Sequence, residues 1–252
     1  MKVLVCTKQI PDPAAPYHLD PETHFLERPT DQILDDTDRY GVEMGLQVAE
    51  QTEGSVTLVS MGPAGNLQGI RQALAMGADK AIVIEDDSLR GADSWVTAQV
   101  LAAAIRNEGF DLVIAGTEST DGSSGVLPQQ LSELLGVPSL TFAKHLERDG
   151  DTIRIQRQTE YGYEVVEAPT PVLITVTSGV VEPRYPTFKG IMAAKKKPIE
   201  QIGVSELGVT PVATQEILEV RPAPKRAAGE IIEDEGEAHL RIIEVLEQAK
   251  VI

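Results

Sequence analysis

The sequence predicts an α/β fold with a Rossmann-like, mostly parallel sheet that carries helices on both faces. Two observations lead to this prediction. Short apolar runs alternate with helical patterns through the first half of the chain, and aliphatic residues dominate a composition that is only 4% aromatic. Strands of a parallel sheet are buried on both faces and therefore read as short apolar runs. Repeated βα units require right-handed crossovers between parallel strands.

Four strand–helix units are expected before Pro138. Each strand is an apolar run, and each helix has apolar residues at helical spacing and is followed by a glycine, a proline or a turn. The strands are expected at residues 2–6, 55–60, 81–84 and 111–115, and the helices at residues 42–49, 67–74, 92–107 and 127–134. Asp35, Asp36 and Asp38 crowd the start of the first helix, where the simplest role of a carboxylate is capping.

The pattern changes after Pro138. Asp149-Gly150 between alternating segments predicts a β-hairpin within residues 145–158. Further strands are expected at residues 163–167 and 172–176, a short helix at 191–197, and a small β excursion at 23–27. Residues 205–235 lack periodicity and are read as an extended arm, and Ile242, Leu246 and Ala249 mark a terminal amphipathic helix. We therefore expect an α/β domain at residues 1–204 and an arm with a helix at 205–252. The apolar face of this helix needs a surface to lie on, which another chain would supply.

Charge and cysteine content narrow the function. A formal net charge of −17 and a pI near 4.6 argue against nonspecific binding to nucleic acid or anionic membranes, since both would repel the chain. The single cysteine, Cys6, excludes an intrachain disulfide, and its place in an apolar run favours a small buried hydrophobe over a catalytic thiol. The four histidines are scattered, and no catalytic or metal-ligand cluster stands out. No signal peptide or long apolar span is recognised, so a soluble cytoplasmic protein is expected.

The most informative segment is the loop between the fourth strand and its helix. Its small residues leave backbone N–H groups exposed at a helix start, where unpaired donors and the helix dipole favour an anion such as phosphate. The spacing is neither GxGxxG nor GxxxxGK[ST], so a tight loop that binds nothing remains the alternative. The candidate residues are Asp121, Gly122, Ser123, Ser124 and Gly125.

A second candidate is a basic cluster in this acidic chain, formed by Lys189, Lys195, Lys196 and Lys197 after a Pro-rich and Gly-rich loop. Such a cluster is either a solvated helix end or a docking surface for an acidic partner.

Several segments, taken together, resemble the β subunit of electron transfer flavoprotein. They are VLVCTKQIPD, SMGPAG, IRQALAMGADKA, AGTESTDG and EPRYPTFKGIMAAKKKPIE, and they span almost the whole chain. The resemblance implies a non-catalytic half of a heterodimer whose α subunit makes most contacts to a redox-active FAD. It also implies that this chain holds AMP in a structural role, or a second FAD in the same place in bifurcating members.

The resemblance assigns residues to both sites. Nucleotide contacts, mostly through the backbone, would fall on Cys6, Asp35, Met61, Ser123, Ser124, Gly125, Val126 and Leu127. Phe188 would be the apolar anchor of a partner-recognition loop, with partner contacts at Glu182, Pro183, Arg184, Tyr185, Ile191, Met192, Lys195, Lys196 and Lys197. Gln158 stands where relatives commonly carry a carboxylate.

The expected function is electron transfer. Flavin dehydrogenases, such as acyl-CoA dehydrogenases, would reduce the FAD of the complex, which would pass electrons to a quinone oxidoreductase or another acceptor. The alternative is a stand-alone adenine-nucleotide-binding or hydrolysing α/β protein, which would explain the loop but neither the basic cluster nor the C-terminal arm.

Overall fold

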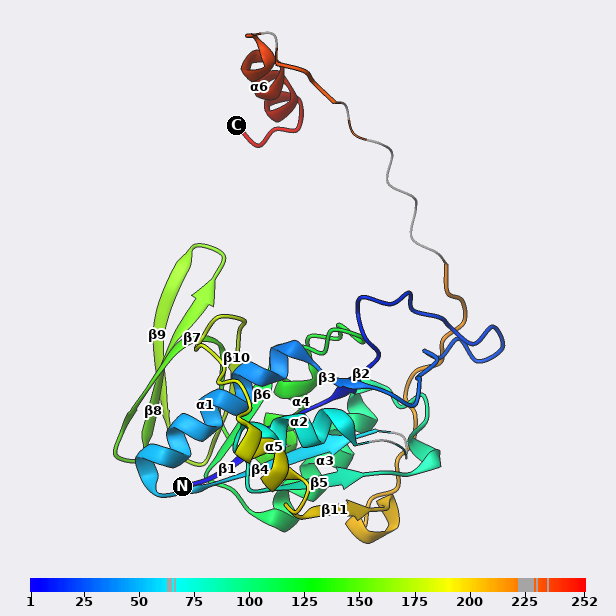
Figure 1. The fold of residues 1–252 in the computed structure, drawn as a ribbon, viewed down its shortest axis with the longest axis vertical. Helices are drawn as coiled ribbons and strands as arrows, with labels where there is room; N and C mark the ends of the chain where they lie inside the picture. The colour runs from blue at the N-terminus through cyan, green and yellow to red at the C-terminus, as the bar shows by residue number, and fades with distance from the viewer. Residues whose placement is uncertain (63–64, 66, 222–228, 230, 235) are drawn as a thin grey trace. The chain divides into compact units, whose positions relative to one another are not determined.

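The computed structural model describes residues 1–62, 65, 67–221, 229, 231–234 and 236–252. These residues form two compact units, Met1–Ile217 and Leu218–Ile252. The first unit is built around a large twisted sheet (Figure 1). Within the described residues this sheet has nine strands in the order β11-β5-β4-β1-β6-β10-β7-β8-β9. The strands are β1 (Lys2–Cys6), β4 (Ser55–Met61), β5 (Lys80–Ile84), β6 (Leu112–Gly116), β7 (Ser139–Asp149), β8 (Thr152–Thr159), β9 (Gly162–Pro169), β10 (Val172–Val176) and β11 (Ile199–Ile202).

Most of the sheet is parallel, and only the β7–β8 and β8–β9 pairs are antiparallel. The predicted Rossmann-like α/β class is therefore confirmed. The first four predicted strands agree with β1, β4, β5 and β6 to within one residue at each end. Their apolar runs were easy to find because both faces of each strand are covered.

Helices cover both faces, as Figure 1 shows. α1 (Asp36–Thr52), α2 (Gln68–Met76) and α5 (Phe188–Ala194) lie on one face, and α3 (Ser94–Glu108) and α4 (Leu127–Leu135) on the other. Alternate side chains of β1 enter the two cores: Val3 and Val5 join the core under α1 and α2, whereas Leu4 and Cys6 join the core under α3. Strand side chains alternate between faces, so this two-sided burial fixes the register of the sheet.

The antiparallel end of the sheet contains the predicted hairpin. β7 and β8 meet at a turn containing Asp149 and Gly150, and Gly150 adopts φ +58°, a left-handed conformation that glycine takes without a steric penalty. β9 extends the predicted strand at residues 163–167 by a residue or two at each end. Several large side chains of β9, including Tyr163 and Val165, are exposed.

Two local predictions are wrong in their bounds. The short helix predicted at residues 191–197 is α5, which begins at Phe188 because the Thr187 side chain accepts a hydrogen bond from the Gly190 amide, 3.0 Å away, and caps it. The excursion predicted at 23–27 forms only an isolated bridge between Leu19 and Leu26. The longer stretch that contains it, residues 11–32, is closed at its two ends by the antiparallel pair β2 (Gln9–Ile10) and β3 (Ile33–Leu34).

Residues 205–217, which the sequence analysis grouped with the arm, lie in the first unit. The short 3₁₀ helix η2 (Val204–Leu207) packs Val204 and Leu207 on the core under α3. A second 3₁₀ helix, η1 (Asp87–Leu89), follows β5 and adds Leu89 to the same core. Thr214 donates through its amide to Asp93 at 2.8 Å. These contacts attach the start of the predicted arm to the sheet domain.

The second unit contains the predicted terminal helix, α6 (Ala238–Gln248). No residue of α6 is buried, and Leu240, Ile242 and Ile243 are among its exposed apolar side chains. Part of the predicted arm, residues 222–228, 230 and 235, falls outside the described residues. Among the helices that the structure describes, none combines the length and apolarity needed to cross a membrane.

Candidate functional site

The topology has its switch point at the carboxyl end of β1. This strand lies between β4 and β6, and the chain therefore leaves it toward one side of the sheet and returns on the other. Open α/β sheets bind ligands at such a switch point, outside the carboxyl ends of the strands. The segment that follows β6, residues 117–127, lies at this edge and is called the nucleotide loop below. It contains every residue of the loop predicted from the sequence.

Asp35 fixes the nucleotide loop to the start of α1. Its side chain is fully buried and caps α1 by accepting from the Thr37 amide at 3.1 Å. The same carboxylate accepts from the amide of Thr120 at 2.7 Å and from its hydroxyl at 2.8 Å. The Asp35 amide donates to the Lys8 carbonyl. The capping role expected of Asp35 is thus observed, and the residue also positions the loop.

Asp121 fixes the loop from the other side. Its buried carboxylate pairs with Lys8 Nζ at 2.7 Å and with Arg28 Nη2 at 2.6 Å. Burial by itself would raise the pKa of Asp121, but the two cations hold the pKa below its ordinary value. A free carboxylate would repel a phosphate, whereas this one is neutralised within the chain. Asp121 therefore organises the loop through two basic residues that lie far from it in sequence.

The backbone between these two fixed points is left open. Ser123 has φ +45° and Gly125 has φ +64°, and the Ser123 amide donates to the Ser119 carbonyl at 2.8 Å. Among the described residues, no acceptor is found for the amides of Ser124, Gly125 and Val126, which lead directly into α4. Exposed N–H groups at a helix start are suited to an anion.

The other predicted nucleotide residues lie near this edge, but in different environments. Met61 ends β4 and is half-buried, and Leu127 opens α4 and packs against the core under α3. Cys6 ends β1 and is buried, and burial, with a smaller contribution from Asp38, raises the pKa of its thiol to about 12. The thiol is therefore protonated and uncharged at neutral pH, which agrees with the expected role of Cys6 as a small buried apolar residue. Pro63 and Ala64 of the SMGPAG segment, and Asn66 directly after it, lie outside the described residues.

The predicted partner residues lie on residues 182–197, called the docking segment below. Tyr185 and Phe188 are 82% and 80% exposed, and Ile191 and Met192 are about half exposed. The side chain of Arg184 is bound to Glu43 and Glu50 of α1. Lys197 is also engaged, because its Nζ donates to the carbonyls of Leu74, Gly77 and Ala78 at the end of α2. Lys189, Lys195 and Lys196 remain exposed. Glu182 is also exposed, and Pro183 is half-buried.

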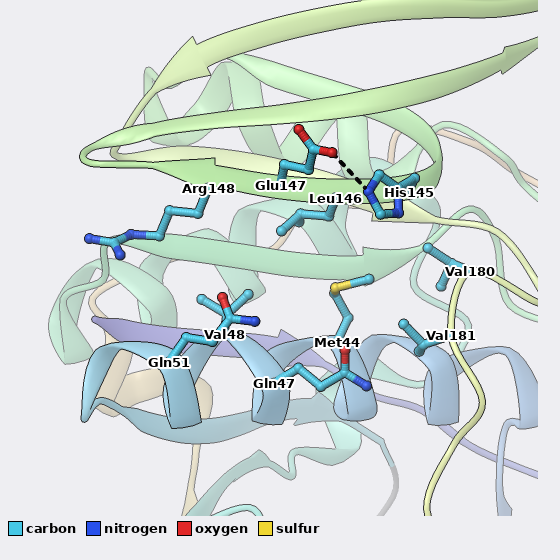
Figure 2. A pocket seen from close by; sticks show the side chains of 10 residues that line it. All are labelled: Met44, Gln47, Val48, Gln51, His145, Leu146, Glu147, Arg148, Val180 and Val181. Carbon is cyan, nitrogen blue, oxygen red and sulfur yellow. Dashed lines mark hydrogen bonds and ion pairs between the residues drawn. The ribbon is translucent and has the colours of Figure 1, made fainter.

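A separate groove of about 440 Å³ runs between α1 and β7 (Figure 2). Its lining includes Met44 and Gln47 of α1 and His145 and Glu147 of β7, and the last two are linked at 3.2 Å. None of the predicted site residues lines this groove.

Sequence reasoning missed the residues that hold both sites in place. Lys8 lies two residues after the end of β1 and could have been suspected as a basic side chain at the switch point. Arg28 and Glu43 carry no such signal, because Arg28 lies in an irregular excursion and Glu43 looks like an ordinary polar residue of a helix. Their partners are identified only by the tertiary structure.

The structure is that of an α/β protein with unpaired loop amides suited to an anion at the switch point of its sheet, and with a second, apolar surface suited to a protein partner. Residues 23–207 match the electron transfer flavoprotein domain family. The chain is 39% identical over 263 residues to the electron transfer flavoprotein subunit beta of Mycobacterium bovis, covering 99% of each chain. It is 34% identical to that of Thermoanaerobacterium thermosaccharolyticum over 261 residues, covering 100% of each. The Caffeyl-CoA reductase-Etf complex subunit CarD of Acetobacterium woodii is 34% identical over 92% of each chain.

The chain therefore belongs to the electron transfer flavoprotein β subunit family, as its sequence motifs predicted. Members of this family are electron-transfer proteins that work with an α subunit. The residue assignments for the nucleotide and for partners stay predictions.

Proposed function

We propose that this chain is the β subunit of a heterodimer that accepts electrons from flavin dehydrogenases, such as acyl-CoA dehydrogenases. The electrons leave toward a quinone oxidoreductase or another acceptor. FAD, held mainly by the α subunit, supplies the redox chemistry when bound. The residues of this chain contribute a surface and a support, and no catalytic side chain is assigned to them.

We also propose that the nucleotide loop holds AMP, or the corresponding part of a second FAD. The amides of Ser124, Gly125 and Val126 would receive the phosphate oxygens, because they have no acceptor among the described residues. Asp35 and Asp121 would keep these amides in place, and the charge of Asp121 is compensated by Lys8 and Arg28. The loop fits a phosphate-bearing group, and its role would be to stabilise the fold by mass action.

The observation that carries the electron-transfer proposal is the docking segment. Its large apolar side chains are exposed, while Arg184 and Lys197 are bound within the chain. Exposed aromatic residues next to basic ones are the kind of surface that anchors a protein partner. Phe188 would enter an apolar pocket of the dehydrogenase, and Lys189, Lys195 and Lys196 would assist encounter with an acidic rim.

The experiment is a dehydrogenase assay with the purified heterodimer as electron acceptor. The proposal expects reduction of the heterodimer by a reduced flavin dehydrogenase and a raised apparent KM in Phe188→Ala. Tyr161→Ala is the matched control, because Tyr161 is also a strongly exposed aromatic residue, at 93%, and lies in the β8–β9 turn away from the docking segment in sequence. A colourless chain that assembles with no α subunit and hydrolyses ATP would contradict the proposal and favour the stand-alone alternative.

A further inference from the structure

The docking segment is attached to α1 through Arg184, which pairs most closely with Glu43. Arg184 Nε lies 2.7 Å from Glu43 Oε2, and Arg184 Nη2 lies 3.0 Å from Glu43 Oε1, so the two groups form a two-pronged pair. The Arg184 amide also donates to Glu43 Oε2 at 3.1 Å. Such fork-to-fork pairs are directional as well as strong. Glu43 therefore fixes both the side chain and the backbone of Arg184.

Glu43 is suited to this role by its burial. Its side chain is only 4% exposed, in the middle of α1, where an unpaired carboxylate would be costly. Burial favours a raised pKa, but hydrogen bonds from Arg184 and Gln47 hold the pKa of Glu43 below its ordinary value. The guanidinium also reaches Glu50 at 2.6 Å, but that carboxylate is 59% exposed and its contribution is screened by solvent.

The backbone around Arg184 has few other polar contacts. Pro183 and Pro186 carry no N–H group. Among the described residues, the Arg184 amide is the sole backbone donor between Val181 and Pro186 with an assigned acceptor. Val181 packs on the core at the start of this stretch, and beyond it the contact of the Arg184 amide with Glu43 is the polar contact that fixes the path.

The other half of the docking segment is fixed differently, through α2. A Cβ on Gly190 would lie 2.5 Å from the Ala75 carbonyl oxygen, so α5 lies directly against α2. Arg71 of α2 donates to the Ala194 carbonyl at 3.1 Å, and Lys197 donates to the last carbonyls of α2. Each helix thus caps the C-terminus of the other. Phe188 lies at the junction of this rigid half and the stretch held by Glu43.

We propose that Glu43 is a positioning residue for partner docking: through Arg184 it sets the path of residues 181–187 and so the direction in which Tyr185 and Phe188 are presented. The inference rests on the proposed function, in which this segment docks to a dehydrogenase. A pre-organised segment loses less conformational entropy on binding than a mobile one. Glu43 itself touches no partner, because it is buried beneath the segment.

The test uses the heterodimer with Glu43→Gln, Phe188→Ala and the double variant, and with Glu50→Gln as the matched control. Hydrogen exchange of the amides of residues 181–188 reports the attachment directly. Glu43→Gln should speed this exchange and raise the apparent KM for the dehydrogenase on the order of tenfold, with kcat and flavin content unchanged. Glu50→Gln should change either quantity less than about twofold.

The double variant tests whether Glu43 acts through Phe188. If it does, Glu43→Gln should add little to the KM of Phe188→Ala, because coupled residues are not additive. The inference would be overturned if Glu43→Gln raised the KM by the same factor in the parent and in Phe188→Ala. Unchanged hydrogen exchange of residues 181–188 in Glu43→Gln would also overturn it. An unchanged KM in Phe188→Ala alone would instead refute the docking function, and exchange would still decide whether Glu43 positions the segment.

A second variant guards against a folding defect in Glu43→Gln. Arg184→Lys keeps the positive charge but loses the planar fork that matches the carboxylate. It should give the same two changes, faster exchange and a raised KM, at a thermal stability closer to that of the parent. Normal exchange and normal KM in Arg184→Lys would also contradict the inference.

Discussion

The nucleotide loop and the docking segment are held in place in the same way, but they expose different chemical groups. In both, a buried carboxylate paired with partly exposed cations holds an irregular segment in place: Asp121 with Lys8 and Arg28 in the loop, and Glu43 with Arg184 in the docking segment. What is left exposed differs. The loop exposes backbone N–H groups, whereas the docking segment exposes the apolar side chains of Tyr185 and Phe188.

This difference separates two kinds of ligand. Unpaired N–H donors bind an anion and make no favourable contact with an apolar surface. Exposed aromatic rings instead bind an apolar pocket of a protein. Some charges that look functional in the sequence, those of Asp121, Arg184 and Lys197, are engaged in holding these segments, whereas the other three lysines of the basic cluster stay exposed. A change in either exposed set should therefore affect one ligand and leave the other unchanged.

The largest effect is expected from Gly125→Pro. Proline removes the amide donor and fixes φ near −65°, whereas Gly125 has φ +64°. Bound nucleotide should be lost. The free energy of unfolding should then fall by about 2.7 kcal/mol, which is the stabilisation by a ligand present at roughly 100 times its Kd. Nucleotide content and Tm of the purified heterodimer measure this. The KM for the dehydrogenase should be unchanged.

Gly125→Ala is the control for that variant. Alanine keeps the N–H group, and its Cβ would lie 3.5 Å from the Glu118 carboxylate, an ordinary contact. The left-handed backbone costs about 1–2 kcal/mol for a residue with a side chain. Nucleotide should be retained at a lowered Tm. Retention of nucleotide by the proline variant would show that the loop amides do not hold it.

The second effect concerns assembly with the α subunit, which would use a third surface, the apolar face of α6. Ile242 and Leu246 of α6 are exposed in this chain, and burial of such side chains is worth about 1.5–3 kcal/mol each. Deletion of residues 236–252 should weaken binding of the α subunit roughly 100-fold or more. Titration of the separated subunits measures this Kd.

Point variants distinguish the helix face from the mere loss of chain. Ile242→Ser with Leu246→Ser should reproduce most of the deletion, whereas Glu247→Ser, on another side of α6, should not. An unchanged Kd in the deletion would place α6 outside the interface.

The third effect is that of Phe188→Ala. Truncation of an aromatic anchor costs on the order of 2 kcal/mol, or roughly 30-fold in apparent affinity. The apparent KM for the dehydrogenase should rise by that factor, while nucleotide content and Tm stay unchanged because Phe188 is 80% exposed. A fall in Tm with loss of nucleotide would show that the two regions are not independent.

The smallest effect concerns Asp38, which lies beside the loop and accepts from the Lys8 amide at 2.7 Å. Burial, and then the neighbouring Asp35, raise the pKa of Asp38 well above its ordinary value. The folded state therefore binds its proton more tightly than the unfolded state, and stability rises as pH falls from the folded pKa toward the unfolded one. Asp38→Asn should be more stable than the parent at pH 7.5, and the difference should narrow at lower pH.

Asp36→Asn is the matched control, because Asp36 is the exposed neighbour in the same helical turn. Thermal unfolding of the parent and both variants across pH 5–8 measures the effect. A parent that gains no stability relative to Asp38→Asn as pH falls would show that Asp38 is ionised without cost.

The sheet and its helices could be predicted because local patterns determine them. Apolar runs such as Leu112–Gly116 and the spacing of Leu127 and Leu131 reflect burial on both faces of a sheet. The exposed backbone of the loop was also predictable, since small residues before a helix have few other outcomes. These features depend on neighbours in sequence.

The devices that fix the sites could not be predicted. Arg28 and Asp121 are 93 residues apart, and Glu43 and Arg184 are 141 apart. Lys197 looked like one of several exposed lysines, yet it caps α2, because α5 lies against that helix. Pairing between distant charged residues leaves no periodic signal and depends on the completed fold.

The most direct test is the nucleotide content of the heterodimer purified from cells that make both subunits. Flavin and AMP are released by denaturation and counted per heterodimer, with Gly125→Pro and Phe188→Ala measured in parallel. We expect one FAD with one AMP, or two FAD, in the parent and in Phe188→Ala, and a single FAD without AMP in Gly125→Pro. A parent complex with one FAD and no second nucleotide, or a Gly125→Pro variant with full content, would contradict this account.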